Sequence, residues 1–410
     1  MARMKLPNAD WQERRGLPEL LAALDGRARY VGGAVRDSLL GVDVKDVDIA
    51  TPLLPDDVMA RLKAVDITVV PTGIDHGTLT AVLPDGPIEI TTLRRDVSTD
   101  GRRATVAFSD DWREDAARRD FTINALFADP DTLEIYDYFD GLNDLEARRI
   151  RFIGSADERI AEDHLRILRY FRFLARFGLT SMDQEAYQAC RSAAEKLPQL
   201  SRERIADELM KLLAVNDPSY AVQQMIGADI FAHILSEIDP DTEQILARLI
   251  QREQAHAIPP IATRRLIALL PKNTEKVATI AEDLRFSKKL QKALQSRLAA
   301  PTDELAAVNA TSVPALAYHH GEEATRDIAL LFAADTDLAA SLATLEGWQK
   351  PEFPLKGGDL ISMGMEPGPA VSETLAKIEQ AWIKQGFPNE EHVYNLTKQA
   401  LERDKITRKI

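Results

Sequence analysis

Two acidic residues at alternating positions of a short apolar run are the first residues that could do chemistry. Asp46 and Asp48 flank Val47 in the run Lys45–Ala50. Side chains of an extended strand alternate between two faces, so both carboxylates would project to one side while Val47 and Ile49 pack in a core. Mg²⁺ prefers one or two carboxylates together with water and substrate phosphates. The pair therefore predicts a magnesium site for phosphate chemistry, although a solvated turn explains an isolated Asp-x-Asp triplet as well.

A glycine turn upstream favours the phosphate interpretation. The segment 29–41 reads as a short strand, the glycines Gly32 and Gly33, and a short helix closed by Gly41. Glycines let backbone amides approach a ligand, and a helix N-terminus attracts phosphate. Arg36 lies one turn into this helix, where a guanidinium could bind a phosphate with two hydrogen bonds. A dinucleotide-binding fold is the rival interpretation, but the Gly-x-Gly-x-x-Gly spacing is absent.

A third carboxylate has the same expected geometry. Glu89 lies between Ile88 and Ile90 in a run that reads as another strand. Three carboxylates on neighbouring strands could hold two metal ions for attack on a nucleoside triphosphate. The alternative for Glu89 is an ordinary solvent-facing position.

Five motifs in a fixed order carry a resemblance to a known family, and a sixth follows in the helical region. The chain resembles the class II tRNA nucleotidyltransferases, which comprise CCA-adding enzymes and bacterial poly(A) polymerases. The resemblance implies a polymerase-β-like palm, that is, a mixed sheet with helices, followed by an all-α region. It also implies Mg²⁺ as cofactor, CTP and ATP as substrates, and the tRNA 3′ end as partner. The motifs are Gly32 to Asp37, Asp46/Asp48, Glu89 to Arg94, Arg118 to Leu126, Glu162 to Arg166 and Glu203 to Leu209.

The pair Asp163 and Arg166 adds base selection. Residues 157–177 have a helical pattern of apolar residues, and positions three apart on a helix face the same way. A carboxylate accepts hydrogen bonds and a guanidinium donates them. Cytosine and adenine both present an amino donor beside a ring-nitrogen acceptor, whereas guanine and uracil present the reverse, so the pair suits C and A. A surface ion pair is the alternative.

The resemblance also assigns residues around the nucleotide. It places Arg169 and Arg172 in the nucleotide pocket, and Arg119 and Asp120 near the ribose and phosphates. For Arg119 and Asp120, a structural salt bridge is an equal alternative. We expect Arg176 to be a plain solvated residue.

Residues 95–113 are polar, with mixed charges and an Asp-Gly turn, and they predict a mobile loop. In relatives, a loop here helps to switch the pocket from CTP to ATP, and enzymes that add only C tend to lack its Asp-Gly-Arg portion. Asp100, Gly101 and Arg102 are present, which favours full CCA addition.

The composition is that of a globular chain of more than one domain, with 410 residues and a net charge of −14. The charge argues against nucleic acid binding unless basic residues gather on one side. The lone Cys190 excludes a disulfide framework, and no apolar stretch could cross a membrane, so we expect a cytoplasmic protein. The candidate basic residues are Arg166 to Arg176, Arg202/Arg204, Lys288/Lys289/Lys292/Arg297 and Lys405/Arg408/Lys409.

Strand patterns end before residue 150, and helical patterns follow, so the fold class is α+β. We expect a catalytic head at 1–150, a helical neck with the nucleotide-recognition helix at 151–215, and an RNA-binding helical body and tail at 216–410. The predicted activity is addition of C, C and A to tRNA from CTP and ATP with no nucleic-acid template. A poly(A) polymerase on the same scaffold is the near alternative, and a catalytically silent RNA-binding protein is the distant one. The expected strands are 28–31, 45–50, 67–71, 78–83, 88–93 and 134–138.

Overall fold

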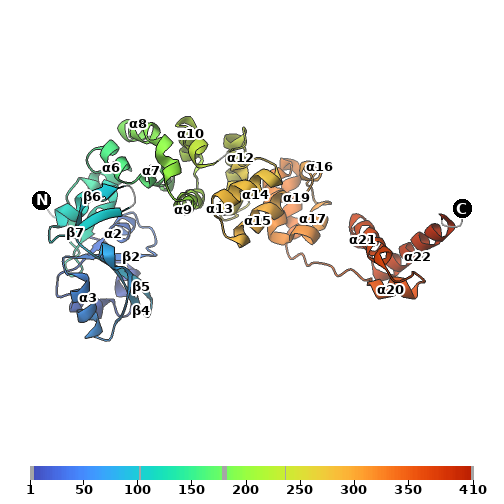
Figure 1. Ribbon diagram of the computed structural model, residues 1–410, viewed down its shortest axis with the longest axis horizontal. Helices are drawn as coiled ribbons and strands as arrows, with labels where there is room; N and C mark the ends of the chain where they lie inside the picture. The colour runs from blue at the N-terminus through green and yellow to red at the C-terminus, as the bar shows by residue number, and fades with distance from the viewer. Residues whose placement is uncertain (1–3, 101–102, 178–181, 236, 408–410) are drawn as a thin grey trace. The chain divides into compact units, whose positions relative to one another are not determined.

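The chain forms two compact units in the computed structural model, Met1–Glu237 and Ile238–Ile410 (Figure 1). The structure describes residues 4–100, 103–177, 182–235 and 237–407. The first unit contains every described strand. The divisions expected at residues 150 and 215 stay predictions.

A mixed sheet of seven strands is the centre of the first unit. Its spatial order is β3-β4-β5-β2-β1-β8-β9, with β2 and β5 parallel and all other neighbours antiparallel. All six expected strands are present, and β8 was missed because three buried residues are too short for a period-two pattern. The strands are β1 (Arg29–Val31), β2 (Val47–Thr51), β3 (Thr68–Gly73), β4 (Thr78–Leu83), β5 (Gly86–Thr92), β8 (Leu126–Ala128) and β9 (Ile135–Asp137).

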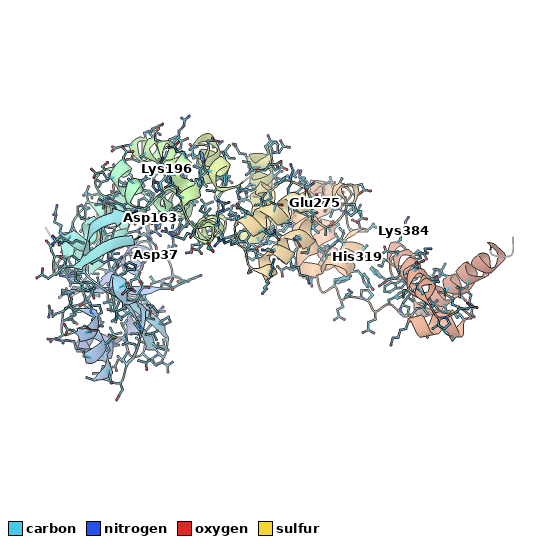
Figure 2. All side chains as sticks on the ribbon, in the orientation of Figure 1. Asp37, Asp163, Lys196, Glu275, His319 and Lys384 are labelled. Atoms are coloured by element: carbon cyan, nitrogen blue, oxygen red, sulfur yellow. The ribbon has the colours of Figure 1, made fainter. Side chains whose placement is uncertain are left out.

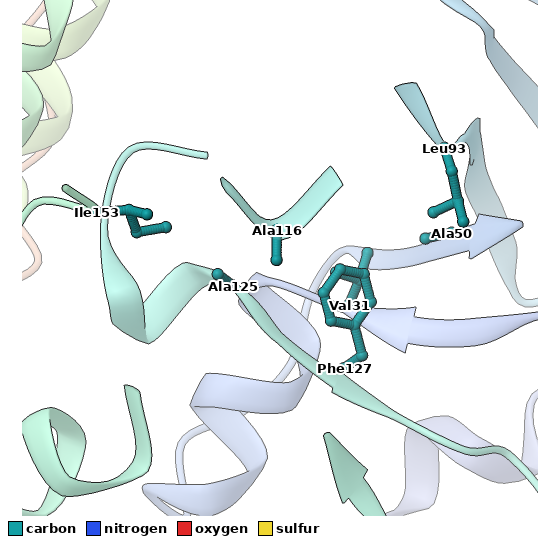
Figure 3. Close-up of a cluster of buried hydrophobic side chains, with 7 residues drawn as sticks. All are labelled: Val31, Ala50, Leu93, Ala116, Ala125, Phe127 and Ile153. Atoms are coloured by element: carbon teal, nitrogen blue, oxygen red, sulfur yellow. The ribbon is translucent and has the colours of Figure 1, made fainter. Parts of the chain in front are cut away.

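The two faces of the sheet differ in what covers them. On one face, Ile49 and Ile90 are buried with the rest of the main core. On the other face, a smaller apolar cluster covers the β1–β8 side of the sheet, as Figure 3 shows. No member of this cluster lies on β5, β4 or β3. It consists of Val31, Ala50, Leu93, Ala116, Ala125, Phe127 and Ile153.

Helices flank the sheet and then continue the first unit. The short helix α2 packs next to β1 and β2, and the short helix α4 packs next to β6. The α-helices of this unit are α1 (Leu17–Ala23), α2 (Gly33–Leu39), α3 (Pro55–Lys63), α4 (Trp112–Ala117), α5 (Gly141–Glu146), α6 (Ala156–Glu162), α7 (Leu165–Arg176), α8 (Gln184–Ser192), α9 (Arg202–Leu213), α10 (Ser219–Gly227) and α11 (Ile230–Ile234).

The prediction of a mobile loop over residues 95–113 is wrong in one respect, because part of this segment forms strands. Strands β6 (Arg94–Asp100) and β7 (Arg103–Phe108) pair as an antiparallel hairpin, separate from the main sheet. Asp-Gly is a common turn pair between hairpin strands, so the sequence contained the signal for this hairpin. Gly101 and Arg102 lie outside the described residues.

The helix expected over residues 157–177 is interrupted. α6 ends at Glu162, and Asp163 has extended backbone angles, with φ −153° and ψ 105°. The Asp163 carboxylate accepts a hydrogen bond from the backbone N–H of Leu165 at 3.1 Å, in the first turn of α7. Aspartate competes for backbone donors in this way, and so it favours helix starts over helix interiors.

Every described element of regular secondary structure in the second unit is a helix. Arg297, expected on an exposed basic face, is instead buried and bound to Asp327 at 2.7 Å, so that part of the expectation is wrong. Arg408 and Lys409 lie outside the described residues. The helices are α12 (Thr242–Ala255), α13 (Ala262–Leu269), α14 (Thr274–Asp283), α15 (Lys288–Leu298), α16 (Thr302–Ala306), α17 (Val313–His320), α18 (Glu322–Phe332), α19 (Asp335–Leu345), α20 (Gly357–Ser362), α21 (Pro369–Lys384) and α22 (Glu390–Thr407).

Among the described residues, no helix combines the length and the apolar character that crossing a bilayer would need. Cys190 is fully buried without a disulfide partner, and burial raises the pKa of its thiol.

Candidate active site

The two aspartates predicted to hold metal and the supporting Glu89 lie near one another at the centre of the sheet. Asp48 of β2 is paired with Glu89 of β5, and Asp46 immediately precedes β2 instead of lying within it. Val47, Ile49, Ile88 and Ile90 are buried on the opposite face. The predicted alternation is therefore confirmed for Asp48 and Glu89.

Burial and negative neighbours destabilise the ionised form of Asp48. Desolvation is the largest cause, followed by the charge of Glu89, and the carboxylate of Asp46 adds to it. Together they raise the pKa of Asp48 from 3.8 to about 6, although Arg119 and Arg36 act in the opposite direction. Carboxylates that repel one another are stabilised by a bound cation.

This donor set fits a hard divalent cation. Asp46 and Asp48 supply only oxygen ligands, which Mg²⁺ prefers, and two protein carboxylates leave room for phosphate and water ligands. Among the described residues, no group of three or more His, Cys, Asp or Glu side chains is arranged to hold a metal ion. Asp46 and Asp48 thus stay the predicted ligands of this site.

The glycine turn lies between β1 and α2 as predicted. Gly32 has φ 65°, a left-handed conformation that favours glycine. A Cβ atom at Gly32 would lie 3.4 Å from Nη1 of Arg119 and 3.6 Å from the backbone oxygen of Asn124. Gly33 begins α2. The absence of a side chain at Gly32 thus lets the backbone of the turn lie close to the guanidinium of Arg119.

Arg36 is buried and already bound by side chains. Its Nε and Nη2 donate to the two carboxylate oxygens of Asp37 at 2.8 and 3.0 Å, and Nη1 donates to Oδ1 of Asn124. Its guanidinium also lies 5.0 Å from the ring centre of Phe173. In this structure the Arg36 side chain joins Asp37 to Asn124, and its predicted contact with triphosphate stays a prediction.

Arg176 is not a plain solvated residue, so that expectation is wrong. Its Nη2 donates to Oδ2 of Asp37 at 2.8 Å, and this bond ties the end of α7 to α2. Figure 2 shows Asp37 and Asp163 in the region where the sheet meets helices α6 to α9. The error arose because Asp37 is distant in sequence, and helix periodicity reports nothing about such a partner.

Asp120, which is buried, forms an ion pair with the partly buried Arg169 of α7. Oδ2 of Asp120 accepts from Nε of Arg169 at 2.7 Å, and Oδ1 accepts from Nδ2 of Asn124 at 2.9 Å. Burial opposes ionisation of Asp120, but Arg169 and these hydrogen bonds outweigh it and lower the pKa to about 2. Asn124 joins this pair to Arg36.

We expect replacement of Asp120 by Asn to destabilise the protein at neutral pH by about 3–5 kcal/mol, the scale for breaking a buried pair by removing one partner. A carboxyl pKa that is lowered on folding stabilises the folded state above pH ~4. That stabilisation is lost as the pH falls through the folded pKa of about 2. Urea unfolding at pH 7 and between pH 4 and 2 measures both effects. The exposed Asp131→Asn is the control, and equal stability of the two variants at pH 7 would contradict the expectation.

Glu208 of helix α9 binds two arginines of the predicted pocket, and both of these arginines lie on α7. Nε of Arg172 donates to Oε2 of Glu208 at 2.6 Å, and Nη1 of Arg169 lies 3.8 Å from Oε1 of the same carboxylate. Glu208 is buried. We missed this role for Glu208, and the only available signal was its membership of the motif Glu203 to Leu209.

Asp163 and Arg166 lie in the same region, but each binds another partner. Oδ2 of Asp163 accepts from Nη2 of Arg204 at 2.7 Å. Arg166 donates to Oε2 of Glu162 at 2.6 Å and to the backbone oxygen of Arg118 at 3.0 Å. The structure thus brings both predicted base-reading groups to the start of α7. Arg204 is a second α9 residue that the sequence analysis did not place in the nucleotide pocket; it had been expected on a basic face.

Arg119 lies beside the acidic centre. Its Nη2 donates to Oδ2 of Asp115 at 3.1 Å, and its guanidinium lies 5.4 Å from the ring centre of Phe127. The charge of Arg119 acts on Asp48. Asp100 ends β6, and the remaining residues predicted for the switching loop are outside the described part.

Comparisons with known proteins support the same assignment. Residues 28–151 match the family described as "Poly A polymerase head domain", and residues 265–394 match one described as "tRNA nucleotidyltransferase domain 2". Residues 181–242 match "Probable RNA and SrmB- binding site of polymerase A". The human protein named "CCA tRNA nucleotidyltransferase 1, mitochondrial" is 32% identical over 401 residues, which cover 94% of this chain and 91% of the relative.

The chain belongs to the CCA-adding tRNA nucleotidyltransferase family. A second relative, the CCA-adding enzyme of Lactiplantibacillus plantarum, is 31% identical and covers 93% of this chain and 94% of its own length. The crystal structure of the Bacillus stearothermophilus CCA-adding enzyme in complex with CTP has a TM-score of 0.74 at 27% identity. The match covers 98% of this chain and 100% of that one. The predicted family and fold class are thereby confirmed, and the chain is a nucleotidyltransferase.

The fold of the family extends to a structure with RNA. The Thermotoga maritima CCA-adding enzyme complexed with tRNA has a TM-score of 0.71 and 21% identity, and the match covers 98% of this chain. At this identity the likeness concerns the fold. CCA-adding nucleotidyltransferases generally use a divalent metal ion.

Proposed function

We propose that this protein adds C, C and A to the 3′ end of tRNA from CTP and ATP without a nucleic-acid template. The observation that carries the proposal is the placement of two sets of residues in one unit. The carboxylates Asp48 and Glu89 are adjacent in the sheet, and Asp163 and Arg166 lie at the start of α7. The first set serves nucleotidyl transfer and the second serves base choice.

Each residue has a proposed part in the reaction. Asp46 and Asp48 would hold Mg²⁺, which when bound offsets charge on the α-phosphate and promotes ionisation of the RNA 3′-hydroxyl. Glu89 supports this centre. The backbone at Gly32 and Gly33 approaches the triphosphate, and Arg119 offsets its charge. The 3′-hydroxyl attacks the α-phosphorus, a new phosphodiester bond forms, the bond to the β-phosphate breaks, and pyrophosphate leaves.

A chain of ion pairs and amide hydrogen bonds supports the predicted nucleotide pocket. Arg176, Asp37, Arg36, Asn124, Asp120 and Arg169 are linked in that order by hydrogen bonds. Arg172 joins them through Glu208. Such buried networks rigidify a site when every member is satisfied. We infer that they fix the start of α7, where Asp163 and Arg166 choose the base, relative to the metal centre.

The cellular compartment of the protein is proposed separately from its activity. The named relatives include a mitochondrial protein and bacterial enzymes. We propose the cytoplasm for this chain, because its single cysteine is buried and has no disulfide partner.

The experiment that tests the function uses three tRNAs, which end before the first C, after C and after CC. Each is incubated with the protein, Mg²⁺ and one labelled nucleoside triphosphate at a time. We expect C on the first two tRNAs, A on the third, and no further growth. Long A tails on any of the three would favour a poly(A) polymerase, and binding without incorporation would favour a silent RNA-binding protein.

A further inference from the structure

A single row of paired residues crosses six strands of the sheet through the acidic centre. The pairing runs from β8 to β3 and places all six side chains on one face. The row divides at Asp48 into two halves of different character. In spatial order it reads Phe127, Val31, Asp48, Glu89, Thr80 and Val70.

The β8–β1 half of the row is buried in an apolar cluster, and the positive charge of Arg119 lies over it. Phe127 and Val31 are buried in the apolar cluster of Figure 3. The guanidinium of Arg119 lies over the Phe127 ring and beside the Gly32 turn. This half offers what a triphosphate needs.

The β5–β4–β3 half is open and, apart from Glu89, uncharged. Val70 is 44% exposed and Val82 is 51% exposed, which is unusual for valines in a sheet. Thr68 pairs with Val82 on the same face, and the hydroxyls of Thr72 and Thr80 are 2.9 Å apart. Methyl groups and hydroxyls suit a ribose and a base edge, because both present apolar surface and hydroxyl or amide groups.

Reaction geometry decides which molecule occupies the open half. In an in-line displacement the attacking and leaving oxygens lie on opposite sides of the phosphorus. If pyrophosphate leaves over the α2 side of Asp48, the attacking 3′-hydroxyl arrives from the Glu89 side. We propose that Thr80, Val70, Thr72 and Val82 form the surface that receives the 3′-terminal nucleotide of the acceptor RNA. This inference rests on the proposed function.

Opposite charges at one exposed position test the surface. We expect Val70→Asp to raise the KM for tRNA about tenfold by repelling the RNA backbone, and Val70→Lys to lower it, with the KM for CTP unchanged in both. A purely structural effect of replacing Val70 would move both variants in the same direction. The matched control is Val65→Asp, since Val65 is also 44% exposed but lies before β3. Equal tRNA KM values for Val70→Asp, Val70→Lys and Val65→Asp would overturn the proposal.

A second measurement addresses the hydroxyls. Thr80→Val should reduce, by about threefold or more, the preference of the protein for an RNA with a terminal 2′-hydroxyl over its 2′-deoxy counterpart. An unchanged preference would contradict a contact at Thr80.

Equilibrium binding of tRNA to the Val70 variants repeats the charge test without catalysis. Absence of elongation by the wild-type protein would count against the proposed function, whereas a missing Val70 contrast in binding would count against the surface alone.

Discussion

Replacing Asp48 by Asn is expected to reduce CMP and AMP incorporation by at least about a hundredfold, the scale for losing one key electrostatic group in an active site. Asn is nearly isosteric but neutral, so the variant keeps its shape and loses a metal ligand. Binding of tRNA should remain within about twofold, because the substitution leaves every basic residue of the helical region in place. Single-turnover incorporation and filter binding measure the two quantities.

The control for this variant is Asp43→Asn, which changes an exposed aspartate outside the strand. It should retain full activity. The metal-free Asp48→Asn protein should also no longer respond to Mg²⁺ in thermal unfolding, whereas the wild type should be stabilised by it. Incorporation above a tenth of the wild-type rate in Asp48→Asn would refute the metal assignment.

The second large effect concerns base choice. Amide side chains can present either a donor or an acceptor, so Asp163→Asn combined with Arg166→Gln should admit UTP and GTP. We expect the preference for CTP over UTP to fall at least about a hundredfold, because wrong bases no longer leave buried polar groups unpaired. The kcat/KM values for the four triphosphates on tRNA lacking CCA measure this preference.

Neighbouring ion pairs provide a stringent control. Arg159 binds Glu162, which also binds Arg166, so Arg159→Gln disturbs the same carboxylate without touching the base-reading pair. It should leave the order of the four triphosphates unchanged. If the double variant keeps the wild-type C and A preference, Asp163 and Arg166 do not read the base.

The structure adds a condition to this selection. Asp163 is bound to Arg204 and Arg166 to Glu162, so a base that pairs with them must share or displace these partners. Arg204 and Glu208 lie four residues apart on α9, and together they contact Asp163, Arg169 and Arg172. We interpret α9 as the element that holds the base-reading residues in place.

Local patterns predicted the acidic centre well, for physical reasons. Alternation of apolar and acidic residues fixes which face a strand buries, so Asp48 and Glu89 followed from their neighbours alone. The positive φ of Gly32 was likewise foreseeable from its place in a strand-to-helix turn. The order of motifs then supplied the family.

What the sequence could not provide were partners distant along the chain. Arg176 and Asp37 are 139 positions apart, so no periodicity predicted their bond. The break at Asp163 was hidden because apolar spacing continues on both sides, while one side-chain hydrogen bond to Leu165 favours a new helix start. The β6–β7 hairpin was missed because its charged composition outweighed the Asp-Gly signal in our reading.

The most direct test of the account is sequencing of RNA 3′ ends after incubation with all four triphosphates and Mg²⁺. Starting from tRNA without CCA, the wild-type protein should yield ends of C, CC and CCA, with CCA accumulating and nothing beyond it. Ends that contain U or G, or A added before two C residues, would contradict selection of C and then A by one side-chain site.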